Sequence, residues 1–357
     1  MRIFLATALL FALAPSARAQ SIDQPPDTTI DAATRSRVID GVLRHLQAGY
    51  IFPEKAAEMA QAVREHSQSG RYDRLGRAQA FAQTLTGDLQ AVSRDRHLEV
   101  VYFRGEVPDE LPDAEPTADE RRARAALGQR VNYGFERVER LDGNVGYLEI
   151  RSFNFTANMI DSTLAAAMTF LANTDALIID VRRNGGGEPE MVAAVCSYLL
   201  PPNRLINKFY WRPQDRWDEF RTSRVSGRHY GMTRPVYVLT SENTFSGAEE
   251  FAYDLQTQRR GEVVGDTTGG GAHPGGMRRV AEHFGVWLPS GRAVNPVTGK
   301  NWEGTGVRPD VPAAASEALR KAHVRALQRL LAAERNAERR MLLERVIGQV
   351  SRAAQTS

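Results

Sequence analysis

The stretch VLTSENTFSGAEEFAYDLQ, residues 238–256, decides the fold, because an apolar strand pattern passes directly into a helix there. Residues 236–241 (VYVLTS) are typical of a short buried strand. Helical i, i+3, i+4, i+7 spacing then follows in Ala248, Phe251, Ala252 and Leu255. Ser246 stands where the helix begins. Its position suits either a plain helix N-cap or a nucleophile presented at the end of a strand.

The same alternation of strand and helix recurs through the second part of the chain. Further strand-like runs occupy residues 145–150, 176–181, 262–266 and 286–289, and helical segments occupy residues 160–171 and 190–199. Continuous apolar strands that alternate with helices predict an α/β fold with a buried sheet.

Helical patterns dominate both ends of the chain. Between residues 30 and 92, breaks at Pro53 and at residues 70–72 predict a bundle of short helices. Residues 316–352 predict one long charged amphipathic helix, or two. Its apolar face would consist of Leu319, Leu327, Leu330, Leu331 and Leu343.

These patterns divide the chain into five predicted segments. They are a signal peptide (1–19), an N-terminal helical domain (20–103), a linker and helix (104–130, with Thr117 as the N-cap), an α/β core (131–315), and a C-terminal amphipathic helix and tail (316–357).

The first twenty residues have the pattern of a secretory signal. Arg2 gives a positive start, residues 3–14 form an apolar run, and residues 17–19 (ARA) fit a small-x-small cleavage site. The run is too short to span a bilayer, and the alternative is a buried N-terminal helix. We expect a cleaved signal, export across the inner membrane, and a periplasmic location.

Composition excludes several classes of function. Without Arg2 and Arg18 the formal charge falls from +3 to +1, and no basic run with interleaved aromatics is present, so we expect no nucleic-acid partner. No later apolar run is long enough for a membrane span. For the single cysteine, Cys196, we expect a buried, inert thiol. The sequence contains no H-E-x-x-H motif and no Cys/His cluster, so we expect neither a catalytic metal nor a cofactor.

Two glycine-rich stretches follow predicted strands. In DVRRNGGG, residues 180–187, the glycine N–H groups could converge on an anion. No Lys-Ser/Thr follows, which disfavours a nucleotide-phosphate loop and leaves an oxyanion site or a tight turn without a ligand. In GDTTGGGAHPGG, residues 265–276, two glycine clusters flank His273, as in a loop at the rim of a site.

Residues 238–256, followed by VVGDTTGGGAHP (263–274) and NPVTGKNWEGTGVRPDV (295–311), resemble the C-terminal processing (tail-specific) peptidase family. The closer similarity is to the branch that includes interphotoreceptor retinoid-binding protein and the tricorn protease core. The resemblance covers about residues 30–312. It implies a crotonase-like spiral of ββα units with a helical N-terminal domain. There is no room for the PDZ domain that many members contain.

The resemblance also implies roles for individual residues. Ser246 takes the position of the family nucleophile. Many members pair this serine with a lysine in T-F-G-K-G, but Gly271 stands at that position here, so a Ser-Lys dyad is not expected. In DRHLEV, residues 95–100, His97 matches the base of the tricorn-like members, and Glu303 matches the acid. His273, in the glycine loop, is the alternative base.

The oxyanion donors would be the backbone N–H groups of Gly185, Gly186 and Gly247. These roles together predict a secreted serine peptidase that hydrolyses peptide bonds through a Ser-His-Glu triad. The alternatives are a non-catalytic binding protein for an apolar, lipid-like or retinoid-like ligand on the same fold, or an esterase.

The expected partner is a peptide or protein substrate, and the C-terminal helix could also pack against a second copy of the chain. The aromatic segment at residues 207–220 either walls a substrate groove or belongs to the core and its rim.

Overall fold

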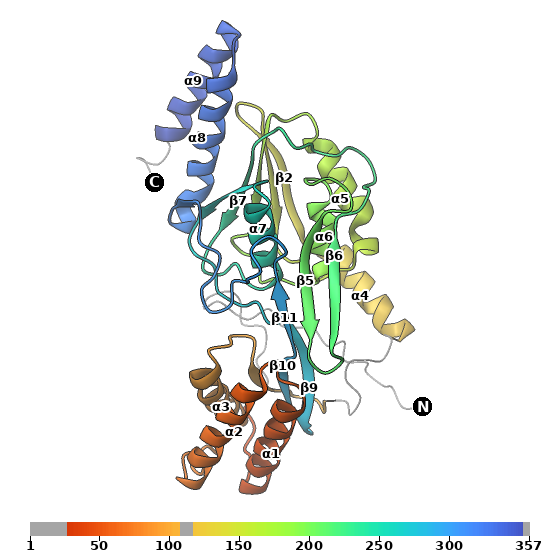
Figure 1. Cartoon of the computed structure of the whole chain (residues 1–357), viewed down its shortest axis with the longest axis vertical. Helices are drawn as coiled ribbons and strands as arrows, with labels where there is room; N and C mark the ends of the chain where they lie inside the picture. The colour runs from red at the N-terminus through yellow and green to blue at the C-terminus, as the bar shows by residue number, and fades with distance from the viewer. Residues whose placement is uncertain (1–26, 108–116, 353–357) are drawn as a thin grey trace.

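The computed structural model describes residues 27–107 and 117–352, so the predicted signal peptide lies outside the described residues. A six-stranded sheet occupies the middle of the molecule, with the N-terminal helices at one end and the C-terminal helices at the other (Figure 1). None of the helices in the described ranges is both long enough and apolar enough to cross a membrane.

The central sheet has the order β12-β8-β7-β4-β3-β2. Its strands are β2 (Phe135–Leu141), β3 (Val145–Ile150), β4 (Ala176–Asp180), β7 (Val236–Thr240), β8 (Glu262–Gly265) and β12 (Val311–Pro312). All neighbouring pairs are parallel except β2 with β3. Because the parallel strands run in one direction, the loops that follow β4, β7 and β8 leave the sheet at the same edge.

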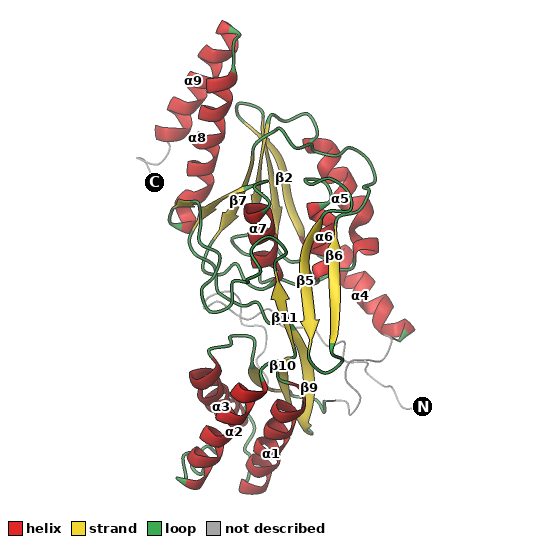
Figure 2. Ribbon diagram, viewed as in Figure 1, coloured by secondary structure: helices red, strands yellow, loops and turns green. Residues whose placement is uncertain are grey.

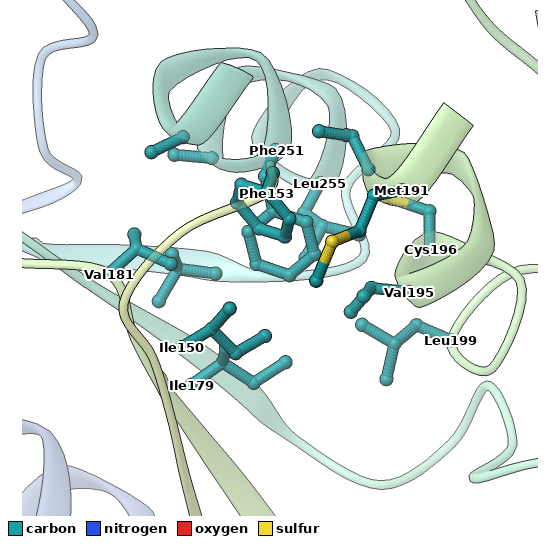
Figure 3. Close-up of a cluster of buried hydrophobic side chains, with 14 of the residues drawn as sticks. Ile150, Phe153, Ile179, Val181, Met191, Val195, Cys196, Leu199, Phe251 and Leu255 are labelled. Carbon is teal, nitrogen blue, oxygen red and sulfur yellow. The ribbon is translucent and has the colours of Figure 1, made fainter. Parts of the chain in front are cut away.

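Alternate residues of each central strand enter two separate cores. Leu148, Leu177 and Val238 share one core with residues of α5 (Ala157–Leu171), α6 (Pro189–Cys196) and α7 (Gly247–Thr257). Figure 3 shows part of this core, with Ile150, Ile179 and Phe251 labelled. Tyr147, Ile178 and Leu239 face the opposite side of the sheet. The period of two in a strand explains why these runs are apolar throughout, since both faces are covered. Cys196 is buried in the first core, as predicted, and burial raises the pKa of its thiol.

The second face of the sheet is covered by α8 (Ala315–Ala333), and α9 (Ala337–Arg352) packs on α8. The predicted C-terminal helix is therefore two helices. Leu327 and Leu343 are buried, and Leu319, Leu330 and Leu331 pack against the same core. Most of the predicted apolar face is thus used within the chain, and association with a second copy stays a prediction.

The N-terminal helices form a bundle with a small sheet. They are α1 (Ala32–Gly49), α2 (Pro53–Gln68) and α3 (Ala78–Ser93), and the sheet has the order β1-β10-β9, from β1 (Glu99–Tyr102), β9 (Gly275–Ala281) and β10 (Phe284–Pro289). Helix residues such as Phe81 share one core with Val286 and Leu288. The β9–β10 hairpin, which lies within the segment predicted as the α/β core, therefore packs with the N-terminal helices.

The remaining elements connect these parts (Figure 2). A third sheet has the order β11-β5-β6, from β5 (Leu205–Trp211), β6 (Arg216–Arg221) and β11 (Gly291–Val294). The aromatic segment at residues 207–220 forms its β5–β6 hairpin. Helix α4 (Ala118–Arg130) begins at Thr117, whose side chain and that of Glu120 form a capping box, and the 3-10 turn η1 (Asn132–Gly134) leads into β2. The α/β core with helical N-terminal and C-terminal regions is confirmed.

Candidate active site

Three loops meet at the edge of the central sheet where β4, β7 and β8 end. The β4 loop and the β7 loop are joined by the Phe245 N–H, which donates to the Asn184 carbonyl oxygen at 3.1 Å. The β7 loop and the glycine loop after β8 are joined by the Gly269 N–H, which donates to the Thr244 carbonyl oxygen at 3.0 Å. The three sequence features that predicted a site therefore lie together, as neighbouring parallel strands require.

Ser246 occupies a strained turn between β7 and α7. Its φ is +53° and its ψ is −122°, a conformation that costs a residue with a side chain of order 1–3 kcal/mol. The hydroxyl is half-buried, and the Gly247 N–H, at the first position of α7, has no hydrogen-bond partner among the described residues. A strained serine between a strand and a helix, beside a free N–H, is the arrangement that presents a nucleophile in other hydrolase folds.

Gly186 makes this close arrangement sterically possible. Its φ is +104°, and a Cβ atom on it would lie 2.7 Å from both the Gly247 nitrogen and the Ser246 Cβ. Only glycine fits here, because a side chain would suffer both backbone strain and a clash.

We expect Gly186→Ala to lower kcat/KM for a peptide substrate at least a hundredfold, because the turn that holds Ser246 must move. Gly87→Ala, at an exposed position where an added Cβ meets no atom within 4 Å, serves as the control and should retain most of the activity. Equal losses in the two variants, measured by peptide hydrolysis, would show that close packing at Gly186 is not needed.

Glu249 fixes the nucleophile turn to the glycine loop. Its fully buried carboxylate accepts hydrogen bonds from Ser246 N–H (2.8 Å), Gly270 N–H (2.6 Å), Gly271 N–H (2.8 Å) and the Thr268 hydroxyl (2.5 Å). Burial raises the pKa of this carboxyl to about 7, although the four donors act to lower it. One side chain thus sets the distance between the β7 loop and the β8 loop.

Glu249→Gln should lower the free energy of unfolding by about 2–3 kcal/mol, because the new NH₂ group would face donors that then lack an acceptor. Chemical denaturation measures this change. The neighbouring Glu242→Gln, on the exposed part of the same loop, should change stability by less than about 0.5 kcal/mol. A Glu249→Gln protein as stable as the parent would contradict the role assigned to this carboxylate.

His97 reaches the site through the small N-terminal sheet. It lies just before β1, and β1 pairs with β10, whose partner β9 begins directly after the glycine loop. The Arg96 guanidinium adds a hydrogen bond of 2.7 Å to the Gly269 carbonyl oxygen. This pairing brings a residue far away in the sequence next to the loop after β8.

The His97 ring packs against the residue that precedes the nucleophile. Its centroid lies 4.6 Å from that of Phe245, and a Cβ on Gly271 would lie 2.6 Å from its Cε1 and would also clash with the Phe245 ring. The imidazole therefore borders the place where the resemblance puts a lysine in other members. Burial lowers the pKa of His97 to about 4, so the ring is neutral near pH 7.

Glu303 lies on the turn that follows β11 and is tied to the same loop. Its Oε2 accepts from the Ala272 N–H at 2.5 Å and lies 3.5 Å from Nδ1 of His273. The predicted hydrogen bond between His97 and Glu303 is not formed, since His97 Nδ1 and Glu303 Oε1 are buried atoms without a hydrogen-bond partner among the described residues. Burial raises the pKa of Glu303 to about 7, with a further contribution from Asp95.

His273, the alternative base, is buried. Its Nδ1 lies 2.9 Å from Oδ2 of Asp95, and its ring centroid lies 5.2 Å from that of Phe52. Asp95 also accepts from the Tyr50 hydroxyl at 3.2 Å and from the His97 N–H at 3.0 Å. His273 therefore has a fixed carboxylate partner, whereas His97 has none in this structure.

The predicted oxyanion donors differ in their availability. The Gly186 N–H donates to Oδ1 of the buried Asn184 at 2.8 Å, so it is occupied. The N–H groups of Gly185 and Gly247 have no hydrogen-bond partner among the described residues. Of the three, Gly247 is the one that directly follows Ser246.

Glu249, Asp95 and Asn184 were not singled out by the sequence analysis. Glu249 stands three residues after Ser246, where the E of a capping box would be, and this spacing could have identified it. Asp95 occupies the first position of the DRH segment. Its contact with His273, far along the chain, depends on strand pairing that the sequence pattern does not reveal.

Comparison with known proteins agrees with this geometry. A family model described as peptidase family S41 matches residues 144–313. A second, described as the N-terminal domain of peptidase S41 in eukaryotic IRBP, matches residues 32–135. Together the two models account for both the N-terminal helical region and the α/β core, in the order in which they occur here.

Carboxyl-terminal-processing peptidase 1, chloroplastic, of Arabidopsis thaliana is 26% identical over 182 residues, which are 50% of this chain and 36% of that relative. The chain thus spans about a third of the length of this relative. Among solved structures, mature CPAF superposes with a TM-score of 0.55 at 13% identity, over 88% of this chain and 99% of that one. A putative peptidase from Parabacteroides merdae superposes with a TM-score of 0.52 at 18% identity, over 78% and 90%. At these identities the structural matches establish the fold.

Proposed function

The chain belongs to peptidase family S41, and on that premise we propose that it is a serine peptidase with Ser246 as nucleophile, His97 as base and Glu303 as the orienting acid. The observation that carries the proposal is the strained Ser246 turn, which has the free Gly247 N–H on one side and the His97 ring against Phe245 on the other. A helix cap alone would not require positive φ at a serine.

In the proposed reaction, Ser246 Oγ attacks the carbonyl carbon of a peptide bond while His97 accepts the hydroxyl proton. The negative oxygen of the tetrahedral intermediate accepts a hydrogen bond from the Gly247 N–H. His97 then donates its proton to the leaving amine, which leaves an acyl group on Ser246. A water molecule releases this acyl group by the same steps, again with His97 as the base.

The orienting role of Glu303 requires a hydrogen bond to His97 Nδ1 that substrate binding would complete. His97 Nδ1 and Glu303 Oε1 are both buried and lack hydrogen-bond partners among the described residues, so each would gain a partner from this contact. Catalytic hydrogen bonds are often long or incomplete before substrate binds, which is consistent with this arrangement.

Reaction with a fluorophosphonate probe tests the proposal directly. We expect labelling of one residue, identified as Ser246 by peptide mapping, together with cleavage of a casein or peptide-library substrate. Labelling with hydrolysis of only ester substrates would favour an esterase. Absence of labelling together with tight binding of a lipid or retinoid would favour the non-catalytic alternative.

The pH dependence of kcat/KM should show a rise with an apparent pKa near 7. His97 is neutral, and able to accept a proton, at all pH values well above its lowered pKa of about 4. Glu303 becomes the charged partner of an imidazolium only above its raised pKa of about 7, so activity should increase as pH passes through that value.

Glu303→Gln should lower activity and remove this rise, because glutamine does not titrate. Glu99→Gln provides the control, since desolvation also raises the pKa of Glu99, whose exposed side chain lies on β1 outside the triad. If the rise persists in Glu303→Gln, another group produces it, and Glu303 is not the orienting acid.

We further propose that the substrate is a peptide or protein and that the chain acts after export to the periplasm. Support for export comes from the signal-like first twenty residues. N-terminal sequencing of the protein recovered from cells should find a chain that begins near residue 20. An intact N-terminus would rule out the cleaved signal.

A further inference from the structure

Asp95, His273 and Glu303 form a cluster of potential metal ligands beside the proposed triad. One ligand atom from each lies within 4.8 Å of the other two. Nδ1 of His273 stands between the two carboxylates, 2.9 Å from Asp95 Oδ2 and 3.5 Å from Glu303 Oε2. The cluster combines residues from the turn before β1, the glycine loop and the turn after β11.

The charges in this cluster are unbalanced. Two carboxylates flank one imidazole, and neither carboxylate forms an ion pair with an arginine or lysine among the described residues. Another histidine–aspartate pair, formed by His66 and Asp88, differs in this respect. His66 lies 3.1 Å from Asp88, which also has an ion pair with Arg71 at 2.8 Å. A cation would compensate the negative charge of Asp95, and that of Glu303 when it is ionised, since among the described residues only His273 lies within ion-pair distance of either carboxylate.

The geometry is close to that of a zinc site. Bonds of about 2.0–2.2 Å from a tetrahedral zinc ion to nitrogen and oxygen place neighbouring ligand atoms about 3.3–3.6 Å apart. The 3.5 Å distance from His273 Nδ1 to Glu303 Oε2 lies within this range, and the 2.9 Å distance to Asp95 Oδ2 is shorter. An imidazole among the ligands favours zinc and its transition-metal neighbours over calcium or magnesium, which prefer oxygen ligands alone.

The carboxylate ligands are held by a second layer of hydrogen bonds. Asp95 accepts from the Tyr50 hydroxyl and the His97 N–H, and Glu303 accepts from the Ala272 N–H. Such outer contacts orient the ligands of established metal sites. We propose that Asp95, His273 and Glu303 bind a divalent transition metal, with Zn²⁺ as the physiological choice, and that the bound metal inhibits the enzyme.

Inhibition, which rests on the proposed function, follows because Glu303 belongs both to the proposed triad and to the metal cluster. A metal ion that takes its carboxylate removes the partner that His97 needs, and it places positive charge next to the imidazole that must accept a proton. Metal binding itself does not depend on catalysis, so the two parts can be tested separately.

Metal-free, tag-free protein would be titrated with Co²⁺ and, in parallel, with Zn²⁺ by calorimetry. We expect one equivalent to bind and Co²⁺ to give the visible absorption of a four-coordinate site. His273→Gln should weaken binding of both ions at least a hundredfold. Glu303→Gln, at a partly exposed position, provides a second variant in case His273→Gln does not fold. His66→Gln, the matched change in the charge-balanced pair, should leave affinity unchanged.

Saturating Zn²⁺ should slow fluorophosphonate labelling of Ser246 at least tenfold, and a chelator should restore it. Failure of Co²⁺ and Zn²⁺ to bind, or equal binding by the parent and both variants at the cluster, would overturn the metal site. Binding without slower labelling would overturn the inhibition. Metal binding by a protein that the probe never labels would refute the peptidase proposal but not the metal site.

Discussion

Ser246→Ala should reduce peptide hydrolysis by a factor of about 10⁴ or more, because it removes the hydroxyl that forms the acyl intermediate in the proposed reaction. The variant should fold normally, since the carboxylate of Glu249 holds the turn through the backbone N–H of Ser246, which the substitution retains. Turnover by the purified variant, together with its unfolding curve, measures both expectations. Cleavage at the parental rate would remove Ser246 from the mechanism.

Ser246→Gly is the informative companion to this variant. It also lacks the hydroxyl, but glycine tolerates a φ of +53°. We expect it to be inactive and about 1 kcal/mol more stable than Ser246→Ala, because relief of backbone strain exceeds the extra flexibility of the unfolded chain. Equal stability of the two variants would indicate that the turn carries no strain.

His97→Ala should lower kcat/KM by a factor of about 10³–10⁴, whereas His273→Gln should lower it less than tenfold in metal-free buffer. The two expected losses differ because the two histidines lie at different distances from the nucleophile loop. His97 packs against Phe245, next to the nucleophile, while His273 is bound to Asp95 in a deeper layer. The comparison therefore decides between the two histidines that the sequence offered.

The rate of fluorophosphonate labelling gives a second measure of the base, beside the rates of peptide hydrolysis. A protein without its base should label slowly, and raising the pH should partly recover the rate, because hydroxide can replace the base. Retained activity in His97→Ala, with loss in His273→Gln, would assign the base to His273 and would make Asp95 its orienting acid in place of Glu303.

The pattern of apolar residues predicted strands β3, β4, β7, β8 and β10 and the helical regions at both ends of the chain. The strand at residues 145–150 coincides with β3, and Pro53 begins α2 as the break in the pattern indicated. Local periodicity and turn residues determine such features, so they can be read along the chain. The β5–β6 hairpin, which contains residues 207–220, was not predicted, because this aromatic segment fitted a groove wall or the core and its rim equally well.

The sequence alone also determined which residues lie at the sheet edge. Ser246, the glycines after β4 and the glycines after β8 each follow a parallel strand, and strands that run in one direction end at one edge. The expected nucleophile and the two loops around it were therefore available from order along the chain. The backbone strain at Ser246 was not, since φ depends on how Glu249 and Gly186 hold the turn.

Only the tertiary structure decided which distant side chains join them. His97 reaches the glycine loop because β1 pairs with β10, and Asp95 reaches His273 through the same pairing. Pairing between strands so far apart in sequence depends on the whole fold, because no local pattern specifies a partner. The sequence thus specified the strands that end at Ser246 and at the two glycine loops, while long-range packing specified the charged groups that surround the serine.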